Sequence, residues 1–474
     1  MASLFSKDKR MIYVRRIRNF WEEYSRKKIG MAGLVILIAY VVVALSAPWL
    51  TSYDPMSQPR LAQAFAKPEW VTILPQYQDL ATTQRISLRW NVEKGFEFVK
   101  GWNLTEAKVH YEAETMKPVV VELSSKFLET KKAPNEFFQK IRYDATNIQD
   151  VEYQITVSLL TPEGDKYLFF RSAAFTVDSV RDVTLDGKDP LFISTLGFKL
   201  TENVANIVFS QKGEYTCIVL ISFRPLSSQA TAEVSVKDAQ VVLLGHVHGI
   251  LGTEYLAHDI FTHLVHGARI SLTVGLLAAI VGTTIGIIVG VSAGYLGGLY
   301  DEFAMRVVDI LLCLPLLPLL LALVALYGRN VYYIVLFIAI FGWQGLARVI
   351  RSQTLSIRET AYIDTAKASG ASGSYIMLRH IVPNIIPVAF ASMILAVPSA
   401  ILFEASLSFL GFGDPRVPTW GMMLQHAFGF GGFSHLAWWW IIPPGLAIIG
   451  LCLSFVFIGY AFDEIVNPRL RRRR

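Results

Sequence analysis

The chain contains six long runs without a charged side chain. They cover residues 30–50, 270–300, 310–328, 331–347, 381–403 and 436–462. A helix needs about 20 predominantly apolar residues to cross the hydrocarbon core of a bilayer. A single run of this kind could be a buried helix of a soluble protein, but six in one chain are not explained that way. The sequence therefore predicts an all-α membrane protein with six transmembrane helices.

The first run is interpreted as a retained transmembrane helix over residues 30–53, and not as a cleaved signal peptide. It is longer than the apolar core of a signal peptide, which is about 7–15 residues. A basic segment, 1–29, precedes it. We expect this segment to lie in the cytoplasm, because Lys and Arg concentrate in the cytoplasmic flanks of membrane spans.

The same charge bias orients the rest of the chain. Arg469, Arg471–Arg474 and the basic loop 348–384 fall on the side of the N-terminus if all six runs cross the membrane. Both termini are then cytoplasmic, and residues 54–245 are extracytoplasmic. The expected location is the cell membrane, with the lipid bilayer as a partner.

The segment 54–245 differs in composition from the remainder. It holds 21 Lys/Arg and 24 Asp/Glu, for a net charge of −3, whereas the remainder has a net charge of +9. The positive-inside bias accounts for that excess, so we expect no nucleic-acid partner. Short β-favouring runs, at 119–123, 150–160, 166–170, 217–223, 232–236 and 240–244, predict an extracytoplasmic β-sandwich-like domain between spans one and two.

Motifs for enzymatic chemistry are missing from the sequence. No G-x-x-x-x-G-K-[ST] phosphate loop, H-E-x-x-H, C-x-x-C or G-x-S-x-G motif occurs. Five histidines lie between 246 and 266, but their spacing is poor for a metal site and no cysteine accompanies them. We expect a protein that is not an enzyme and that binds no metal and no cofactor itself.

Two features of the apolar runs bear on helix packing. Gly282, Gly286, Gly290 and Gly294 recur every four residues and form one stripe on a helix, which predicts close packing against another helix. Pro315 and Pro318 in the third run, and Pro387 and Pro398 in the fifth, favour kinks. Such kinks are typical of helices that line a pathway, although packing geometry alone explains them equally well.

Three polar residues near the predicted spans are pathway candidates: Asp309, Glu404 and Ser406. Asp309 follows Arg306 by three residues, a spacing that favours an ion pair on one helix face. Glu404 lies toward the outer end of the fifth span, where a charged group is costly unless it faces water or a partner. A buried hydrogen-bonding role is the alternative for Glu404.

The predicted cytoplasmic loop, about 351–384, has the pattern of two short helices joined by a turn. Residues 359–368 favour a helix, Gly370 and Gly373 interrupt it, a short helix follows, and Pro383 ends the segment. Such a projection is suited to docking into a groove of another protein.

This loop resembles the "EAA" loop of ABC importer permeases. Asp364-Thr365-Ala366 stands at the acidic-Ala-Ala trio, Gly370 at the following glycine, and Ile381-Val382-Pro383 at the Ile-x-x-Pro-like end. Asp replaces Glu and Thr replaces Ala. The resemblance implies that the loop contacts an ATPase subunit through Glu359, Tyr362, Asp364, Ala366, Gly370, Ala371, Ser372, Arg379, His380 and Pro383.

Other stretches resemble the C-type permease subunit of dipeptide, oligopeptide and nickel importers. They are 248–254 with 267–272, Glu404-Ala405-Ser406 through Gly413, Pro418-Thr419-Trp420-Gly421, and Asn467-Pro468-Arg469. The resemblance covers about 1–53 and 246–474, with 246–474 as a permease core of five spans. The β-rich segment is not part of the usual pattern.

The resemblance implies a type I ABC importer permease. The partners would be a second homologous permease, two ATPase subunits carrying ATP and Mg²⁺, and an extracytoplasmic substrate-binding protein. Peptides are the first expected substrate, followed by oligosaccharides and then nickel. From the residues alone, a membrane receptor with a β ligand domain remains the alternative.

Overall fold

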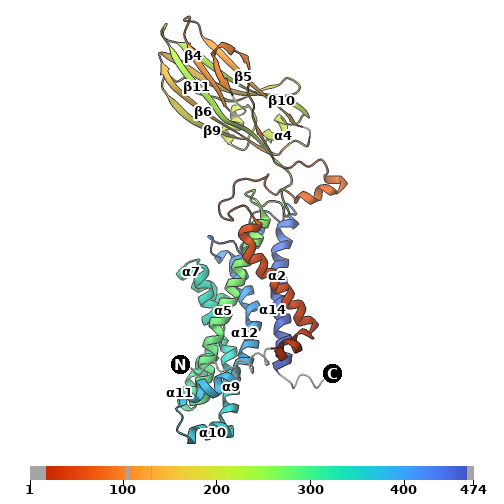
Figure 1. The fold of residues 1–474 in the computed structure, drawn as a ribbon, viewed down its shortest axis with the longest axis vertical. Helices are drawn as coiled ribbons and strands as arrows, with labels where there is room; N and C mark the ends of the chain where they lie inside the picture. Colours follow the sequence, from red (N-terminus) through yellow and green to blue (C-terminus); the bar gives the residue numbers. More distant parts are fainter. Residues whose placement is uncertain (1–17, 103–105, 130, 467–474) are drawn as a thin grey trace. The chain divides into compact units, whose positions relative to one another are not determined.

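The computed structural model describes residues 18–102, 106–129 and 131–466. The basic residues before Arg18 and the Asn467-Pro468-Arg469 motif lie outside the described residues. The chain divides into two compact units. One contains Met1–Gln58 and Ile260–Arg474, and the other is Pro59–Asp259. Figure 1 shows the first as a helical bundle and the second as a set of β-strands.

The helical unit contains five helical segments that are long and apolar enough to cross a membrane, counted over the described residues. They are Lys28–Leu50 (α2), Ile260–Leu296 (α5), Val331–Arg358, Gly373–Phe412 and Trp438–Ile465. Val331–Arg358 comprises α8 (Val331–Ile340) and α9 (Gln344–Arg358). Gly373–Phe412 comprises α11 (Gly373–Ile376), η4 (Met377–Ile381), α12 (Val382–Leu407) and η5 (Ser408–Phe412). The last span lies in α14 (Trp438–Val466), and α10 (Ala361–Ala368) and α13 (Trp420–Gly429) are shorter.

The expected third span, 310–328, is not one straight helix. The structure has α6 (Gly298–Cys313) and α7 (Leu316–Tyr327), bent by 88° at the break between them. Pro315 has no N–H to continue the α6 hydrogen-bond ladder, and it favours extended backbone at Leu314, whose ψ is 131°. The bent pair makes a sixth crossing only if both helices count as one span.

Glycines allow the first and last long helices to pack closely. A Cβ on Gly33 of α2 would meet the backbone oxygen of Ser454 at 2.7 Å, and one on Gly30 would be too close to the Cβ of Ala461. Both partners lie on α14. In lipid, small residues of this kind let two helix backbones approach and gain dispersion contacts.

The unit Pro59–Asp259 is built on two sheets. One has the strand order β3-β4-β11-β6-β9 with β1 paired to β11, and the other has the order β2-β5-β10-β7-β8. Every strand pair is antiparallel. The strands are β1 (Gln84–Ser87), β2 (Asn91–Lys94), β3 (Val99–Trp102), β4 (Glu106–Glu112), β5 (Val119–Glu129), β6 (Glu136–Gln149), β7 (Val151–Leu160), β8 (Lys166–Arg171), β9 (Ser179–Asp186), β10 (Gly213–Pro225) and β11 (Thr231–Leu244).

One hydrophobic core joins the two sheets. Alternate residues along β4, β7 and β10 are buried, as expected for strands with one face toward a core. The rings of Tyr111 on β4 and Phe223 on β10 stack across the core with centroids 4.7 Å apart. Cys217 is fully buried, and burial raises the pKa of its thiol to about 12.

Several strand predictions agree with the structure, and one is wrong. The hairpin at 150–170 is present as β7 and β8, closed by the Thr161 N–H donating to the Asp165 oxygen at 2.9 Å. The expected strands 232–236 and 240–244 are a single strand, β11, with a register shift between Lys237 and Gln240. Asp238 adopts a φ of 45° within this shift, which interrupts the alternation that a sequence pattern follows.

The predicted boundary at residue 245 is also wrong, because the compact β unit extends to Asp259. Residues near Lys67 pair with the segment after β11. The Lys67 N–H donates to the His246 oxygen at 2.8 Å, and the His248 N–H donates back to the Lys67 oxygen at 2.8 Å. The Thr253 N–H donates to the Ala66 oxygen at 2.9 Å. These bonds place 246–259 with the β unit and not with the helical core.

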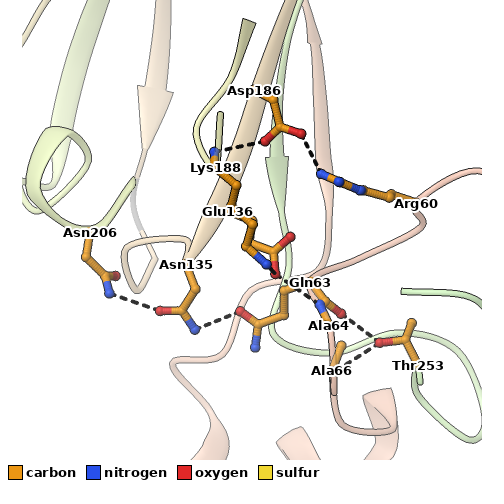
Figure 2. Close-up of polar contacts among 10 residues, drawn as sticks. All are labelled: Arg60, Gln63, Ala64, Ala66, Asn135, Glu136, Asp186, Lys188, Asn206 and Thr253. Atoms are coloured by element: carbon orange, nitrogen blue, oxygen red, sulfur yellow. Dashed lines mark hydrogen bonds and ion pairs between the residues drawn. The ribbon is translucent and has the colours of Figure 1, made fainter. Parts of the chain in front are cut away.

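A polar network holds the start of this unit against its sheets (Figure 2). Glu136 accepts the Ala64 N–H at 3.2 Å and pairs with Lys188 at 2.6 Å. Arg60 donates to Asp186 at 2.7 Å. The entering chain is therefore fixed at two points, and the Glu136 carboxylate, which is largely buried, is paired as a buried charge must be.

Candidate functional site

The glycine stripe of α5 packs against α8 and α9, as the spacing predicts. A Cβ on Gly290 would meet the Ala347 backbone oxygen at 2.6 Å, and one on Gly294 would meet the Arg351 oxygen at 2.9 Å. Gly286 faces Leu346, and Gly282 faces Ala339 more loosely. The predicted close packing is confirmed, and its partner lies within the chain.

The turn around Gly370 is a well-formed helix C-cap at the end of α10. The Ala371 N–H donates to the Ala366 oxygen at 3.1 Å, and the Gly370 N–H donates to the Lys367 oxygen at 2.9 Å. These two bonds define a Schellman motif, which places its C′ residue in the left-handed region. Gly370 has a φ of 78° and open space around its Cβ position. The sequence break predicted at this glycine is therefore confirmed.

The loop 359–372, which we call the coupling loop, rests on an apolar cluster. Ile363 of α10 and Ile376 of α11 are buried together with Ile350 of α9 and Val291 of α5. Arg358 donates to the Tyr295 backbone oxygen at 3.1 Å, which ties the end of α9 to the end of α5. A force on α10 would therefore reach both long helices. In Figure 1, α10 and α11 lie at the opposite end of the helical unit from α7.

Two predicted limits of this loop are wrong. Residues 351–358 belong to α9, so the turn begins at Glu359 and not near 351. Pro383 does not end the segment, because helix continues from Gly373 to Phe412. The π-helical turn η4 precedes Pro383, and the Val382 N–H bonds to the Met377 oxygen five residues back. This local rewinding is one way in which a helix accommodates a proline.

Three rings, those of Tyr362, Tyr375 and His380, pack together beside the coupling loop. The His380 ring lies 6.2 Å from the Tyr362 ring and 5.8 Å from the Tyr375 ring, between centroids. The Asn384 side chain donates to the His380 backbone oxygen at 2.7 Å. The exposed residues among those predicted to contact a partner are Glu359, Tyr362, Asp364, Gly370, Ser372, Arg379 and Pro383. Ala366, Ala371 and His380 are half-buried and support that surface.

The expected ion pair of Asp309 with Arg306 is replaced by another. Asp309 of α6 accepts from Arg348 of α9 at 2.6 Å, and both side chains are about half exposed. The sequence spacing along one helix could not reveal a partner 39 residues away on α9. The neighbouring pair of Arg351 with Asp301 again joins α9 to α6.

Glu404 is buried and bonded to its own helix. The Ser408 hydroxyl donates to Glu404 Oε1 at 2.6 Å, and the Thr419 hydroxyl lies beside the carboxyl. Only 1% of Glu404 is exposed, in agreement with the hydrogen-bonding alternative. Ser406 points elsewhere, and its hydroxyl donates to the Leu402 oxygen at 2.7 Å.

A cavity of about 320 Å³ lies within the helical unit. It is lined by α5, by the α6–α7 break, by the junction of α8 and α9, and by α12. Its polar side chains are Gln344 and Ser399, and none of Asp309, Glu404 and Ser406 lines it. Sequence reasoning missed Gln344, whose signal was a lone amide near the end of the apolar run 331–347.

In the described part of the chain, the histidines between 246 and 266 are not arranged as a metal centre. Within the described ranges, no group of three or more His, Cys, Asp or Glu side chains is arranged to hold a metal ion. His258 pairs with Glu254 at 3.1 Å, and His263 bonds to the Pro55 oxygen at 2.8 Å. His266 bonds to the Thr51 hydroxyl at 3.1 Å.

Comparison with known families agrees with this architecture. Residues 282–472 match the binding-protein-dependent transport system inner membrane component. Residues 16–68 match the N-terminal TM domain of oligopeptide transport permease C. The matched segments flank most of the β unit. The chain belongs to the binding-protein-dependent permease family.

Two curated relatives agree with this family assignment. The chain is 36% identical over 222 residues to the dipeptide transport system permease protein DppC of Bacillus subtilis, covering 47% of this chain and 69% of that protein. It is 35% identical over 223 residues to the glutathione transport system permease protein GsiD of Pectobacterium atrosepticum, covering 47% and 73%. The inward-facing MetNI methionine ABC transporter aligns at 19% identity and a TM-score of 0.36, covering 44% and 95%.

Membership in this family establishes the general role of the chain. It is a multi-pass inner-membrane permease subunit of an ABC importer, a transport component whose ATPase activity resides in separate subunits. Permeases of this kind work with a partner permease, ATPase subunits and a binding protein. The comparisons give no support to the receptor alternative.

Proposed function

We propose that this permease imports peptides. Support comes from its relatives, whose names specify dipeptide, oligopeptide and glutathione transport. Oligosaccharides and nickel rank after peptides, because no relative reported above is named for either. The subunit supplies half of the pathway, and a second homologous permease supplies the other half.

The proposed topology has six spans, with α6 and α7 together forming the third. Both termini and the coupling loop lie in the cytoplasm, and Pro59–Asp259 forms an extracytoplasmic β-sandwich. The support is the charge distribution, since basic residues concentrate in the N-terminal segment, in the coupling region and at the C-terminus.

The coupling loop is the proposed contact with one of two ATPase subunits. The observation that carries this proposal is its construction: an exposed turn at Gly370 stands on a buried apolar cluster shared with α5 and α9. Movement of the ATPase would shift α10 as a rigid piece. Packed helices transmit such a shift, and the spans would rock between inward-open and outward-open arrangements.

Nucleotide chemistry is assigned to the partners. ATP and Mg²⁺ would bind in the ATPase subunits, and this chain would hold no cofactor. A substrate-binding protein would deliver the peptide from outside, and the β unit would dock or orient it.

The coupling proposal is tested by Gly370→Val in the reconstituted transporter. A β-branched residue at a φ of 78° is strained and adds bulk on the exposed turn. We expect ATPase subunits to co-purify poorly and peptide uptake to fall by about tenfold or more.

The matched control is Gly164→Val in the β7–β8 turn, where φ is 100° and the Cβ position is also open. It introduces comparable backbone strain away from the coupling loop. Unchanged uptake and unchanged ATPase binding with Gly370→Val would refute the coupling role.

A further inference from the structure

The span Val331–Arg358 is interrupted close to its centre. Helix α8 ends at Ile340, and α9 begins at Gln344. The first intrahelical bond of α9 runs from the Ala347 N–H to the Trp343 oxygen at 3.0 Å. The N–H groups of Gln344, Gly345 and Leu346 therefore precede the α9 ladder and have no acceptor within it.

The residue at the N-cap of α9 does not cap the helix start with its side chain. Trp343 occupies the N-cap position and makes no capping hydrogen bond. Gln344 and Gly345 both line the cavity of about 320 Å³. A Cβ built on Gly345 meets no heavy atom within 4 Å, so a ligand can approach its backbone. The start of α9 thus presents backbone donors toward an open space.

The Gln344 side chain gives an independent indication of a ligand. Only 4% of the residue is exposed, and the residue lines the cavity. Among the hydrogen bonds between described residues, none involves this amide. The Gln344 amide atoms are not among the fully enclosed polar atoms that lack a partner, so they remain accessible to water or to a ligand that enters the cavity.

The hydrogen-bond donors at the start of α9 favour a ligand that accepts hydrogen bonds. The N-terminus of an α-helix carries a partial positive charge of about half a unit, and it acts more strongly away from water. No described carboxylate side chain lines the cavity, but the C-terminal ends of α6 and α8 border it and carry the opposite partial charge. The local donors at the start of α9 therefore matter more than the net charge of the cavity. Backbone N–H donors beside a neutral amide donor suit a carboxylate, which accepts several hydrogen bonds.

We infer that the N-terminus of α9, with the Gln344 amide, binds the C-terminal carboxylate of the transported peptide near the middle of the membrane. This inference rests on the proposed peptide substrate and adds a subsite to it. The cavity volume is at the lower end of the range for small-ligand pockets, which suits the end of a peptide.

The test uses the reconstituted four-subunit transporter with its binding protein. Uptake of labelled alanyl-alanine is compared with uptake of alanyl-alanine amide, and each rate is corrected for the binding protein's separately measured affinity. Wild type is expected to prefer the free acid. Gln344→Leu is expected to reduce that preference about tenfold, because one hydrogen bond to a charged group is lost.

Gln353→Leu is the matched control, since Gln353 lies on the same helix but does not line the cavity. It is expected to keep the wild-type preference. A third substrate, alanyl-glutamic acid α-amide, carries its carboxylate only on the side chain. If Gln344→Leu affects this peptide and not alanyl-alanine, the assignment to the C-terminal carboxylate is overturned.

Gly345→Ala decides the matter if Gln344→Leu fails to assemble. The added methyl meets open space, so the helix should fold, but it stands over the backbone donors. A lowered free-acid preference supports the site. An unchanged preference in either assembled variant overturns the subsite and leaves the proposed peptide function standing. If wild type imports neither dipeptide and no labelled oligopeptide either, the peptide function itself fails, and the subsite fails with it.

Discussion

Asp414 organises the segment between η5 and α13 through hydrogen bonds with Val331 and Arg416. Its carboxylate accepts the Val331 N–H at 3.1 Å, and it accepts the Arg416 side chain at 2.8 and 2.9 Å. The hydrogen bonds from Arg416 hold the pKa of Asp414 below its usual range, although burial opposes them. One acidic side chain therefore satisfies the start of α8 and fixes the turn that precedes α13.

Replacing Asp414 with Ala is expected to destabilise the helical unit by about 1–3 kcal/mol, because the Val331 N–H loses its acceptor. Arg416 is largely exposed, so its share is screened by solvent. Thermal unfolding of the detergent-solubilised protein measures the change. The Asp414 contribution is present above its unfolded pKa and is lost as pH falls through the lower folded pKa. Asp414→Asn should recover part of the loss, and equal stability of Ala and wild type would contradict this role.

His246 gives a second residue-scale prediction, in the β unit. Burial and, to a smaller extent, the positive charge of Lys132 together lower the pKa of His246 to about 4. Neither ring nitrogen has a hydrogen-bond partner, so the neutral ring is the form that fits. The unfolded chain binds a proton near pH 6.5, whereas the folded chain does so only near pH 4. Stability therefore falls as pH is lowered from 6.5 to 4.

Hydrogen exchange of β11 (Thr231–Leu244), followed between pH 4 and 7 and corrected for intrinsic exchange, checks this dependence. His246→Leu should flatten it, because the titrating ring is removed. A slope that is the same in the variant and in wild type would assign the effect to other groups.

At the scale of elements, the contact between α5 and α9 depends on the absence of side chains. Gly290→Ala is expected to cost about 1–3 kcal/mol, because the new methyl would lie 2.6 Å from the Ala347 backbone oxygen, which cannot move independently. Gly445→Ala on α14 is the control, since its Cβ position is open. It should be neutral or stabilising by up to about 1 kcal/mol, the ordinary gain in helix propensity. Unfolding in mixed micelles compares the two.

The same contact shows what sequence periodicity can and cannot predict. The spacing of Gly282 through Gly294 revealed a packing stripe, because that pattern belongs to one helix. It did not identify α9 as the partner, and the pairing of Asp309 with Arg348 was missed for the same reason. At Pro315 the sequence predicted a kink, and the structure has a bend of 88° between two helices. At Pro383 the sequence predicted the end of a segment, but the preceding π-helical turn lets the helix continue. Tertiary packing decides these features, and local propensity does not.

At the scale of the whole molecule, each of the two units has its own hydrophobic core. The β unit has its own core between two sheets, and the described helices of the other unit have apolar clusters of their own. The sequence predicted this division from composition. It placed the second boundary 14 residues early, at 245 and not at Asp259, because 246–259 pairs with a segment near Lys67.

Replacing Pro59–Asp259 with a short Gly/Ser linker tests the proposed role of the β unit. The helical unit should still assemble with its partners and keep basal ATPase activity, because its clusters do not draw on the removed residues. Affinity of the reconstituted transporter for the binding protein should fall by about tenfold or more, as measured by surface plasmon resonance. Glu136→Ala retains the unit but removes the acceptor for Ala64 and the partner of Lys188, so it should loosen the entering chain and weaken docking less. Unaltered affinity in the deletion would exclude a docking function, since the surface required for it would be gone.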